Sequence, residues 1–286
     1  MVQGRLLVFL VLVLALTGCE ETATPPDKPN VLVPLADQYQ SEGSCRLRGS
    51  VRLAGTPPVV AHFRSIDQPL TDQPPPPARD WPNPNACRLT DQGRLQDALV
   101  FLSGIKPQAS RPWFHEPVTV ELVSQQFVVR QGSAAKRLGI VQQGRAVRMV
   151  SRDDLYHAVQ GRGAAFFGLS LPAPQQVREQ RLDHPGLVEL RSGAGYYWMR
   201  AFLLVSPHPY VTTTDARGEF SLDGIPPGDY EVVAWHPSWV VQQEERNQDN
   251  SRIQQVRFRT GLETSARVSL GEGAASAVDL TLTVRK

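Results

Sequence analysis

Short stretches in which apolar and polar residues alternate run through most of the chain, separated by glycine and proline. The last stretch is the most regular, because Val278, Leu280, Leu282 and Val284 alternate with polar neighbours. A period of two places such residues on one face of a β-strand. The same criterion predicts strands over 45–53, 95–102, 118–123, 126–130, 139–141, 146–150, 187–191, 199–205, 219–222, 230–235, 254–259 and 267–270. Many short strands between glycine and proline turns predict an all-β fold built from sandwiches.

Helical periodicity is scarce. The best window is 175–181, which follows Pro172 and Pro174 and is at most two turns long. Residues 67–85 are dominated by proline, with four in succession at 74–77, and predict a polyproline or irregular loop.

The first nineteen residues predict export. Arg5 precedes an unbroken apolar run over 6–16, and the chain then reads Leu16-Thr17-Gly18-Cys19. This run is short for a membrane span and typical of a cleaved signal. The last four residues resemble the lipobox of bacterial lipoproteins, which implies that Cys19 is acylated; an ordinary signal peptide with a chance cysteine is the alternative. Glu20, in place of aspartate, implies outer-membrane sorting if the host is Gram-negative.

Length, hydrophobic content and charge limit the kinds of domain and partner that the protein can have. The 286 residues, 41% of them hydrophobic, leave room for about two domains after a signal and a tether. The net charge is +2 and the charges are interspersed, so we expect no nucleic-acid partner. Membrane contact is expected from the lipid, because several acyl chains hold a protein stably.

Two cysteines, Cys45 and Cys87, remain once Cys19 is set aside. Outside the cytosol such a pair is most simply a disulfide, which would stabilise the fold by about 4 kcal/mol through chain entropy. A free pair or a metal-binding pair is the alternative, although no CxxC spacing favours a metal.

The C-terminal part has a recognisable pattern. A turn at 214–218, a strand with Phe220 and Leu222, a second turn at 223–228 and a strand with Tyr230 and Val232 follow one another. The pattern resembles the carboxypeptidase-regulatory-like domains, which are small transthyretin-like sandwiches that usually lack catalytic residues. The stretch 47–57, together with 95–102, looks like part of a similar module or an added sheet.

Residues 118–205 resemble cupredoxins, and look closest to periplasmic cupredoxins with a regulatory-like module, some labelled methylamine-utilisation proteins. The segment 153–159 looks like the first ligand loop and implies a ligand role for His157. The second loop reads Cys-x-x-His-x-Trp-Met in the family and Gly-Ala-Gly-Tyr-Tyr-Trp-Met at 193–199 here. Gly193 therefore stands at the cysteine position and Tyr196 at the histidine position, whereas Met199 is retained. A shift of one residue would place Ser192 in the cysteine position.

These replacements remove two of the ligands that a copper site of this kind requires. A blue-copper centre needs two imidazoles and a thiolate with a weak axial methionine. We therefore expect a cupredoxin fold that has lost its copper, with no cofactor; copper or another metal at His157 and Met199 is the alternative. His157 as a simple loop histidine is a further interpretation.

For the other histidines we expect structural roles in preference to catalytic or metal-binding ones. His208 and His236, each followed by proline, are expected to pack at a domain interface, with a shared metal or a partner-binding surface as alternatives. We take His62, His115 and His184 as surface or structural residues. The chain has no phosphate loop, HExxH, GxSxG or CxxC motif, and the adjacent Asp153 and Asp154 make a poor acid–base pair, so we expect no enzyme.

The expected organisation has five parts: a lipoprotein signal peptide (1–19), a flexible tether (20–44), an N-terminal β segment with a proline-rich loop (45–114), a cupredoxin-like domain (115–206) and a regulatory-like domain (207–286). The expected function is that of a lipid-anchored, periplasm-facing or surface protein that binds other envelope proteins, as an accessory subunit of an envelope or redox complex. One alternative is metal binding or electron transfer through His157, Met199, His208 and His236. Another is carbohydrate binding by loop aromatics, namely Trp81, Trp113, Tyr197, Trp198 and Trp239.

Overall fold

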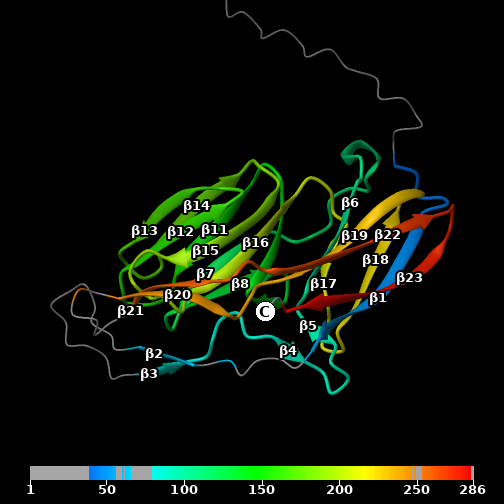
Figure 1. The fold of residues 1–286 in the computed structure, drawn as a ribbon. Helices are drawn as coiled ribbons and strands as arrows, with labels where there is room; N and C mark the ends of the chain where they lie inside the picture. The colour runs from blue at the N-terminus through cyan, green and yellow to red at the C-terminus, as the bar shows by residue number, and fades with distance from the viewer. Residues whose placement is uncertain are drawn as a thin grey trace, which may run out of the picture.

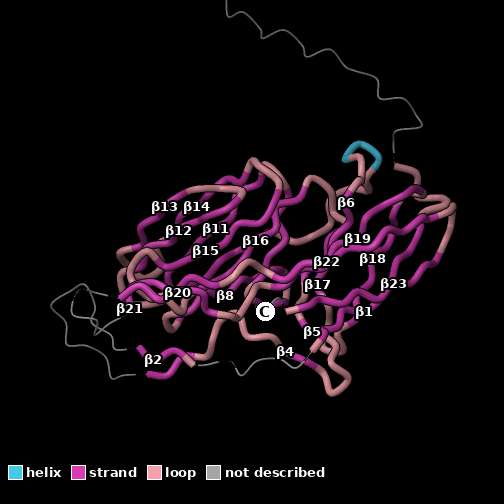
Figure 2. The backbone as a smooth tube through the Cα atoms, viewed as in Figure 1, coloured by secondary structure: helices cyan, strands magenta, loops and turns pink. Residues whose placement is uncertain are grey.

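Strands dominate the molecule. The computed structural model describes residues 39–55, 60, 62–65, 79–246, 248 and 253–284. Within these ranges the regular structure is β-strand apart from one 3₁₀ turn, η2 (Pro107–Ala109), so the predicted all-β class is confirmed (Figures 1 and 2). The predicted signal peptide, Cys19 and most of the tether lie outside the described residues. No helix within those ranges is long and apolar enough to cross a membrane.

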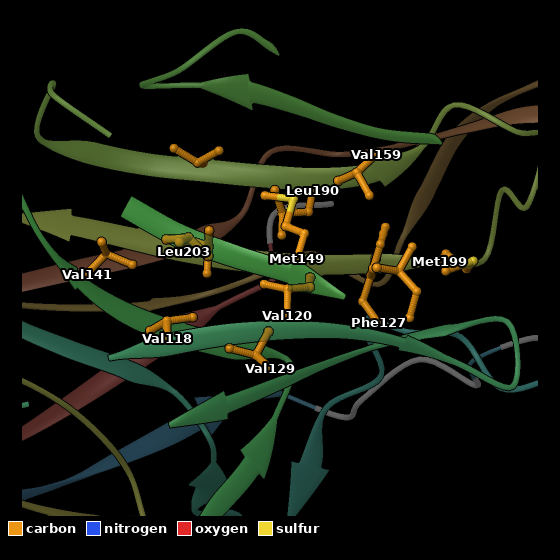
Figure 3. Packing of buried hydrophobic residues seen from close by; sticks show 14 of the residues in the cluster. Val118, Val120, Phe127, Val129, Val141, Met149, Val159, Leu190, Met199 and Leu203 are labelled. Atoms are coloured by element: carbon orange, nitrogen blue, oxygen red, sulfur yellow. The ribbon is translucent and has the colours of Figure 1, made fainter. Parts of the chain in front are cut away.

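One sandwich is built from residues 118–206 and is called here the inserted sandwich. Its first sheet has the order β10 (Leu138–Gln142), β16 (Arg200–Ser206), β15 (Gly186–Ser192), β12 (His157–Gly163) and β13 (Phe167–Leu171). The facing sheet has the order β14 (Val177–Leu182), β11 (Arg145–Ser151), β7 (Val118–Val123), β8 (Gln126–Gln131) and β9 (Ala134–Lys136). Inward residues of both sheets, such as Val120 and Leu190, meet in one core (Figure 3).

The prediction of a helix at 175–181 is wrong. This window forms β14, which pairs antiparallel with β11 from Arg145↔Leu182 to Val150↔Val177. Leu182 is fully buried in the core of the inserted sandwich. β14 is an edge strand, so the pairing with β11 satisfies the backbone groups that face β11, and together with the burial of Leu182 it outweighs a weak local preference for helix.

The other sandwich is split in sequence, and is called here the split sandwich. One sheet has the order β18 (Glu219–Ile225), β1 (Cys45–Ala54) and β23 (Ala275–Thr283), and the other β17 (Val211–Thr213), β6 (Leu99–Ser103), β19 (Gly228–His236) and β22 (Leu262–Leu270). Residues 47–54 of the stretch 47–57, expected in a similar module or an added sheet, lie in β1, the central strand between β18 and β23. Domain boundaries themselves remain a prediction.

The two sandwiches share a third apolar layer. Leu99, Val211 and Trp235 from the split sandwich pack against Leu138, Phe202 and Leu204 from the inserted one. The rings of Phe202 and Trp235 meet edge to face, with centroids 5.2 Å apart. The inserted sandwich thus leaves the split sandwich after β6, returns before β17, and packs on the sheet that both strands belong to.

Two hairpins of the split sandwich reach the inserted one. Strands β2 (Phe63–Ser65) and β3 (Arg79–Trp81) form one, and β20 (Val241–Arg246) and β21 (Ile253–Phe258) form the other. Phe63, Trp81 and Val256 are buried in the core of the inserted sandwich. A third, short hairpin of β4 (Arg88–Leu89) and β5 (Leu95–Gln96) stays with the split sandwich.

The predicted disulfide between Cys45 and Cys87 is not formed, and both residues are free thiols. Cys45 lies beside the first residue of β19, because its Sγ donates to the carbonyl oxygen of Gly271 at 2.9 Å and Leu270 pairs with Gly228. Cys87 precedes β4, whose Arg88 forms an ion pair with Asp97 near the last residues of β19. The ends of β19 are about 26 Å apart, whereas bridged Cα atoms lie within about 7 Å.

Candidate functional site

The segments that resemble cupredoxin ligand loops meet at one end of the inserted sandwich. His157 begins β12, and Met199 precedes β16; their exposed fractions are 0% and 1%. The rings of His157 and Tyr196 are neighbours, with centroids 5.5 Å apart. The structure therefore brings His157 and the loop 193–199 together, as the resemblance implied.

Asp153 organises this end of the sandwich. Its carboxylate accepts hydrogen bonds from the backbone amides of Ser124 (2.6 Å) and Gln125 (2.8 Å) and from Nε2 of His157 (3.0 Å). Ser124 and Gln125 both have positive φ, as the tight turn between β7 and β8 requires. Burial raises the pKa of Asp153, but the hydrogen bonds from His157 and the two amides outweigh it and hold the pKa below its usual value.

His157 is thereby fixed in one tautomer. Because Nε2 donates to a carboxylate, Nδ1 of the neutral ring carries a lone pair. Nδ1 is buried and has no hydrogen-bond partner in the described part of the chain. A carboxylate that orients an imidazole with its other nitrogen bare is an arrangement that metal sites use.

Aromatic side chains cover the loop 193–199. Trp81 stacks on Trp198 with ring centroids 5.1 Å apart and planes 12° from parallel. Trp198 in turn donates from Nε1 to the carbonyl oxygen of Gln125 at 3.0 Å. Phe63 contacts Tyr197 edge to face at 5.7 Å. The hairpins β2–β3 and β20–β21 thus close over the loop, and Met199 lies at the Phe127 end of the core (Figure 3).

The residues present do not fit a blue-copper centre. Gly193 and Tyr196 supply no thiolate or imidazole. In addition, a side chain at Gly193 would point to the outer face of the sheet, away from His157. A Cβ at Gly193 would meet Gln160 at 3.0 Å and Ala158 at 3.3 Å. Both alternate with the core residue Val159 and so lie on the outer face, whereas His157 and Val159 share the inner face. Among the described residues no group of three or more His, Cys, Asp or Glu could hold a metal ion.

The histidines beside the split sandwich do not share a site. His208 lies just before Tyr210, whose carbonyl accepts from Leu102, and Leu102 pairs with Val232. His236 is four residues further along β19, about 13 Å away along the strand. The register therefore does not support the shared-metal alternative for these two residues. His236 contacts the Pro237 carbonyl through Nδ1 at 2.8 Å and the ring of Trp239.

Two further expectations concern His115 and the aromatic residues proposed for carbohydrate binding. His115 contacts the carbonyl of Pro209 through Nε2 at 2.8 Å, which is a structural role. The aromatic residues proposed for carbohydrate binding form no exposed platform, because Trp81, Trp198 and Trp239 are 2%, 3% and 3% exposed. Their indoles belong to apolar cores.

The residues that sequence reasoning missed are charged. Glu189 and Arg191 on β15 and Arg200 on β16 form a cluster on the outer face of the sheet, next to Gly193. Arg200 is 3% exposed, and its guanidinium donates to the carbonyl of Val256 and lies 4.5 Å from the ring of Phe258. The only sequence signal is that Glu189 and Arg191 interrupt an otherwise apolar run at alternate positions.

Comparisons with known proteins complete the description. A family model described as "BOS complex subunit NOMO1-like, second beta sandwich domain" matches residues 208–257. This match agrees with the β-sandwich that these residues help to form. No curated protein matches the chain significantly.

Among solved structures, the M98A mutant of amicyanin in its Cu(I) form is similar at 15% identity, covering 32% of this chain and 82% of its own, with a TM-score of 0.26. A Cu-containing nitrite reductase (NirK) from Thermus scotoductus SA-01 is similar at 19% identity, covering 36% of this chain and 25% of its own, with a TM-score of 0.27. At these values the similarities say nothing about metal binding by this chain.

Proposed function

We propose that the protein is a non-enzymatic, lipid-anchored envelope protein that serves as a protein-binding subunit of a larger complex. The observation that carries the proposal is the closure of the loop 193–199. His157 and Met199 are buried, and Phe63 and Trp81 from a hairpin of the split sandwich pack on Tyr197 and Trp198 of this loop. A loop used in this way joins two domains into one body, and it is poorly placed to exchange a metal or an electron with solvent.

The family match supports the same proposal. Residues 208–257, which resemble a β-sandwich domain of a complex subunit, include β17 to β19 and the hairpin β20–β21. Val211 of β17, Trp235 of β19 and Val256 of β21 pack against residues of the inserted sandwich. A rigid, multi-sandwich body on a tether suits a scaffold that presents surfaces to partner proteins.

Site-specific photo-crosslinking in the native host tests the binding role. Phe166, between β12 and β13, is 81% exposed, the most among the large apolar residues described. A photoreactive residue at Phe166 should give a discrete protein adduct, whereas one at the exposed Ser269 of β22 should not. The substitution Phe166→Ser should then reduce recovery of the same partner. A protein that sediments as a monomer and gives no adduct at either position would contradict the proposal.

The anchor needs its own test. The change Cys19→Ser should release the protein from membranes, because the acylated side chain is lost. The measurement is fractionation after a high-salt wash, with Cys87→Ser as the control that removes a different thiol. Retention of the Cys19→Ser protein on washed membranes would show that acylation at Cys19 is not what holds it.

A second candidate function is favoured by the bare Nδ1 of His157. With Nε2 held by Asp153, the ring presents a lone pair in a buried site, which suits a metal other than blue copper. Elemental analysis of protein purified from its native compartment tests this candidate. Stoichiometric metal that is lost in His157→Gln would favour it, and a metal-free wild-type protein would exclude it.

A further inference from the structure

A pocket of about 200 Å³ lies on the outer face of the sheet β10-β16-β15-β12-β13, beside the loop 193–199. Its walls come from the loop 193–199 itself and from β12, β15, the first residue of β16 and β21. Gln160 and Arg191 face each other across neighbouring strands on one side, and Gln255 closes the pocket from the hairpin. The absence of a side chain at Gly193 keeps the wall open, because a Cβ there would press on the amide of Gln160 at 3.0 Å.

The charge on this pocket is positive. Glu189 shares its two carboxylate oxygens between Arg191 (2.5 Å) and Arg200, so two guanidiniums face one carboxylate. Glu189 does not line the pocket, and none of the lining residues in the described part of the chain is acidic. Burial lowers the pKa of Arg200 from its usual 12.5 to about 10, which shows how poorly solvated this cation is. The cluster therefore carries one uncompensated positive charge.

Unused donors accompany that charge. Nε of Arg191 and Nε of Arg200 are both buried, and neither has a hydrogen-bond partner among the residues that the structure describes. Arg200 is 3% exposed, so water has little access to its donor. A buried donor without a partner costs free energy unless another group accepts from it. Gln160, Gln254 and Gln255, which carry side-chain amides, line the same pocket.

We infer that this pocket binds a carboxylate group. A carboxylate can accept from the guanidinium of Arg191, whose side chain is 22% exposed, and guanidinium groups match its planar geometry. The negative charge would balance the second arginine, which Glu189 leaves uncompensated. Since a liquid water molecule occupies about 30 Å³, the volume suits a small organic acid or the carboxyl end of a peptide. This inference stands apart from the proposed function, because it needs neither the lipid anchor nor a protein complex.

Isothermal titration calorimetry with the full chain tests the inference. The probes are acetate and succinate for a free acid, and one short peptide with either a free or an amidated C-terminus, all at constant ionic strength. At least one carboxylate should bind saturably with a stoichiometry of one, and chloride should not compete. If only the free-ended peptide binds, the natural ligand is a chain end; if succinate or acetate binds, it is a free acid.

Two variants and one control localise the binding. Arg191→Gln removes one donor and the extra charge, and Gln160→Glu supplies an internal carboxylate opposite Arg191; each should weaken binding about tenfold or more. Gln243→Glu makes the same amide-to-acid change at an exposed position of β20 outside the pocket, and should bind like wild type. Circular dichroism checks that each variant folds, and if Arg191→Gln does not, Gln160→Glu decides. No saturable binding of any carboxylate by wild type, or equal binding by Gln160→Glu, would overturn the inference.

Discussion

At the scale of single residues, one position decides what the loop 193–199 can do. Adjacent residues of a strand point to opposite faces, so an error of one residue moves a side chain across the sheet. Gly193 lies one residue after Ser192, which pairs with Val159 and shares its face. A sequence comparison can match Gly193 to a ligand position, but only the register shows that it faces Gln160.

Copper titration of engineered variants tests that register. We expect no intense visible thiolate-to-copper band from wild type, and none from Gly193→Cys with Tyr196→His, because the new thiol would lie on the outer face near Gln160. The matched variant is Ser192→Cys with Tyr196→His, in which the thiol shares the face of His157. A band from the Gly193 variant, measured by visible absorption, would show that the register is wrong.

His236 makes stability depend on pH. Burial lowers its pKa from the usual 6.5 to about 4. Between these values the unfolded chain binds a proton that the folded protein does not, so the free energy of unfolding falls as pH drops through this window. The expected loss is about 3 kcal/mol. Urea denaturation at pH 7 and pH 4.5 should show a smaller loss for His236→Gln than for wild type, while the exposed His184→Gln should match wild type. An unchanged pH dependence in His236→Gln would refute this.

At the scale of elements, β1 depends on a glycine. Gly49 pairs with Val278 of β23 and with Phe220 of β18. A Cβ at Gly49 would lie 1.7 Å from the carbonyl oxygen of Val278 and 2.9 Å from the ring of Phe220. The central strand therefore approaches the backbone of its parallel neighbour more closely than any side chain permits.

The substitution Gly49→Ala should accordingly destabilise the protein by about 3 kcal/mol or more, because either the backbone of β23 or that of β1 must move. Thermal or urea denaturation measures the effect. Gly168→Ala is the matched control, since a Cβ at this strand glycine would meet nothing within 4 Å. If the two variants are equally stable, the close approach of β1 and β23 is not as described.

The sequence predicted most strands correctly because the alternation of apolar and polar residues is a local pattern that neighbouring residues reveal. The strands over 45–53, 118–123, 230–235 and 278–284 all have counterparts at nearly the same bounds. The window 175–181 failed because its polar residues give no clear period, and its pairing with β11 decided the conformation. Arg191 and Arg200 were overlooked for a related reason: charged residues in strands are usually exposed, and Arg200 is buried against Val256 and Phe258, which lie more than fifty residues away in sequence.

At the scale of the whole molecule, the split sandwich owes its completeness to segments far apart in sequence. Nothing local in residues 45–103 says which sandwich they join, because strand pairing is decided by contacts with the last third of the chain. The resemblance of 214–232 to a regulatory-like module identified its later strands, but β1 and β6 supply the centre of one sheet and an inner strand of the other.

A fragment experiment checks this arrangement. The fragment 207–286 should not fold alone, because it lacks β1, which separates β18 from β23, and β6, which joins β17 to β19. Circular dichroism and hydrogen exchange measure this. The full chain with the hairpin change Gln243→Glu serves as a folded reference. A cooperatively folded fragment would mean that β18, β19, β22 and β23 suffice without the earlier strands.

The pairing of β1 with β23 also determines when, during synthesis, the split sandwich can fold. Ser50 donates to the carboxylate of Asp279 at 2.6 Å across 229 residues of sequence. Contacts over such separations require the closure of a very long loop, and folds dominated by them fold slowly. Until β23 is synthesised, one edge of β1 has no strand to pair with. The nascent chain should therefore remain unfolded in this part, competent for translocation and able to bind holdase chaperones, until its last strand is made.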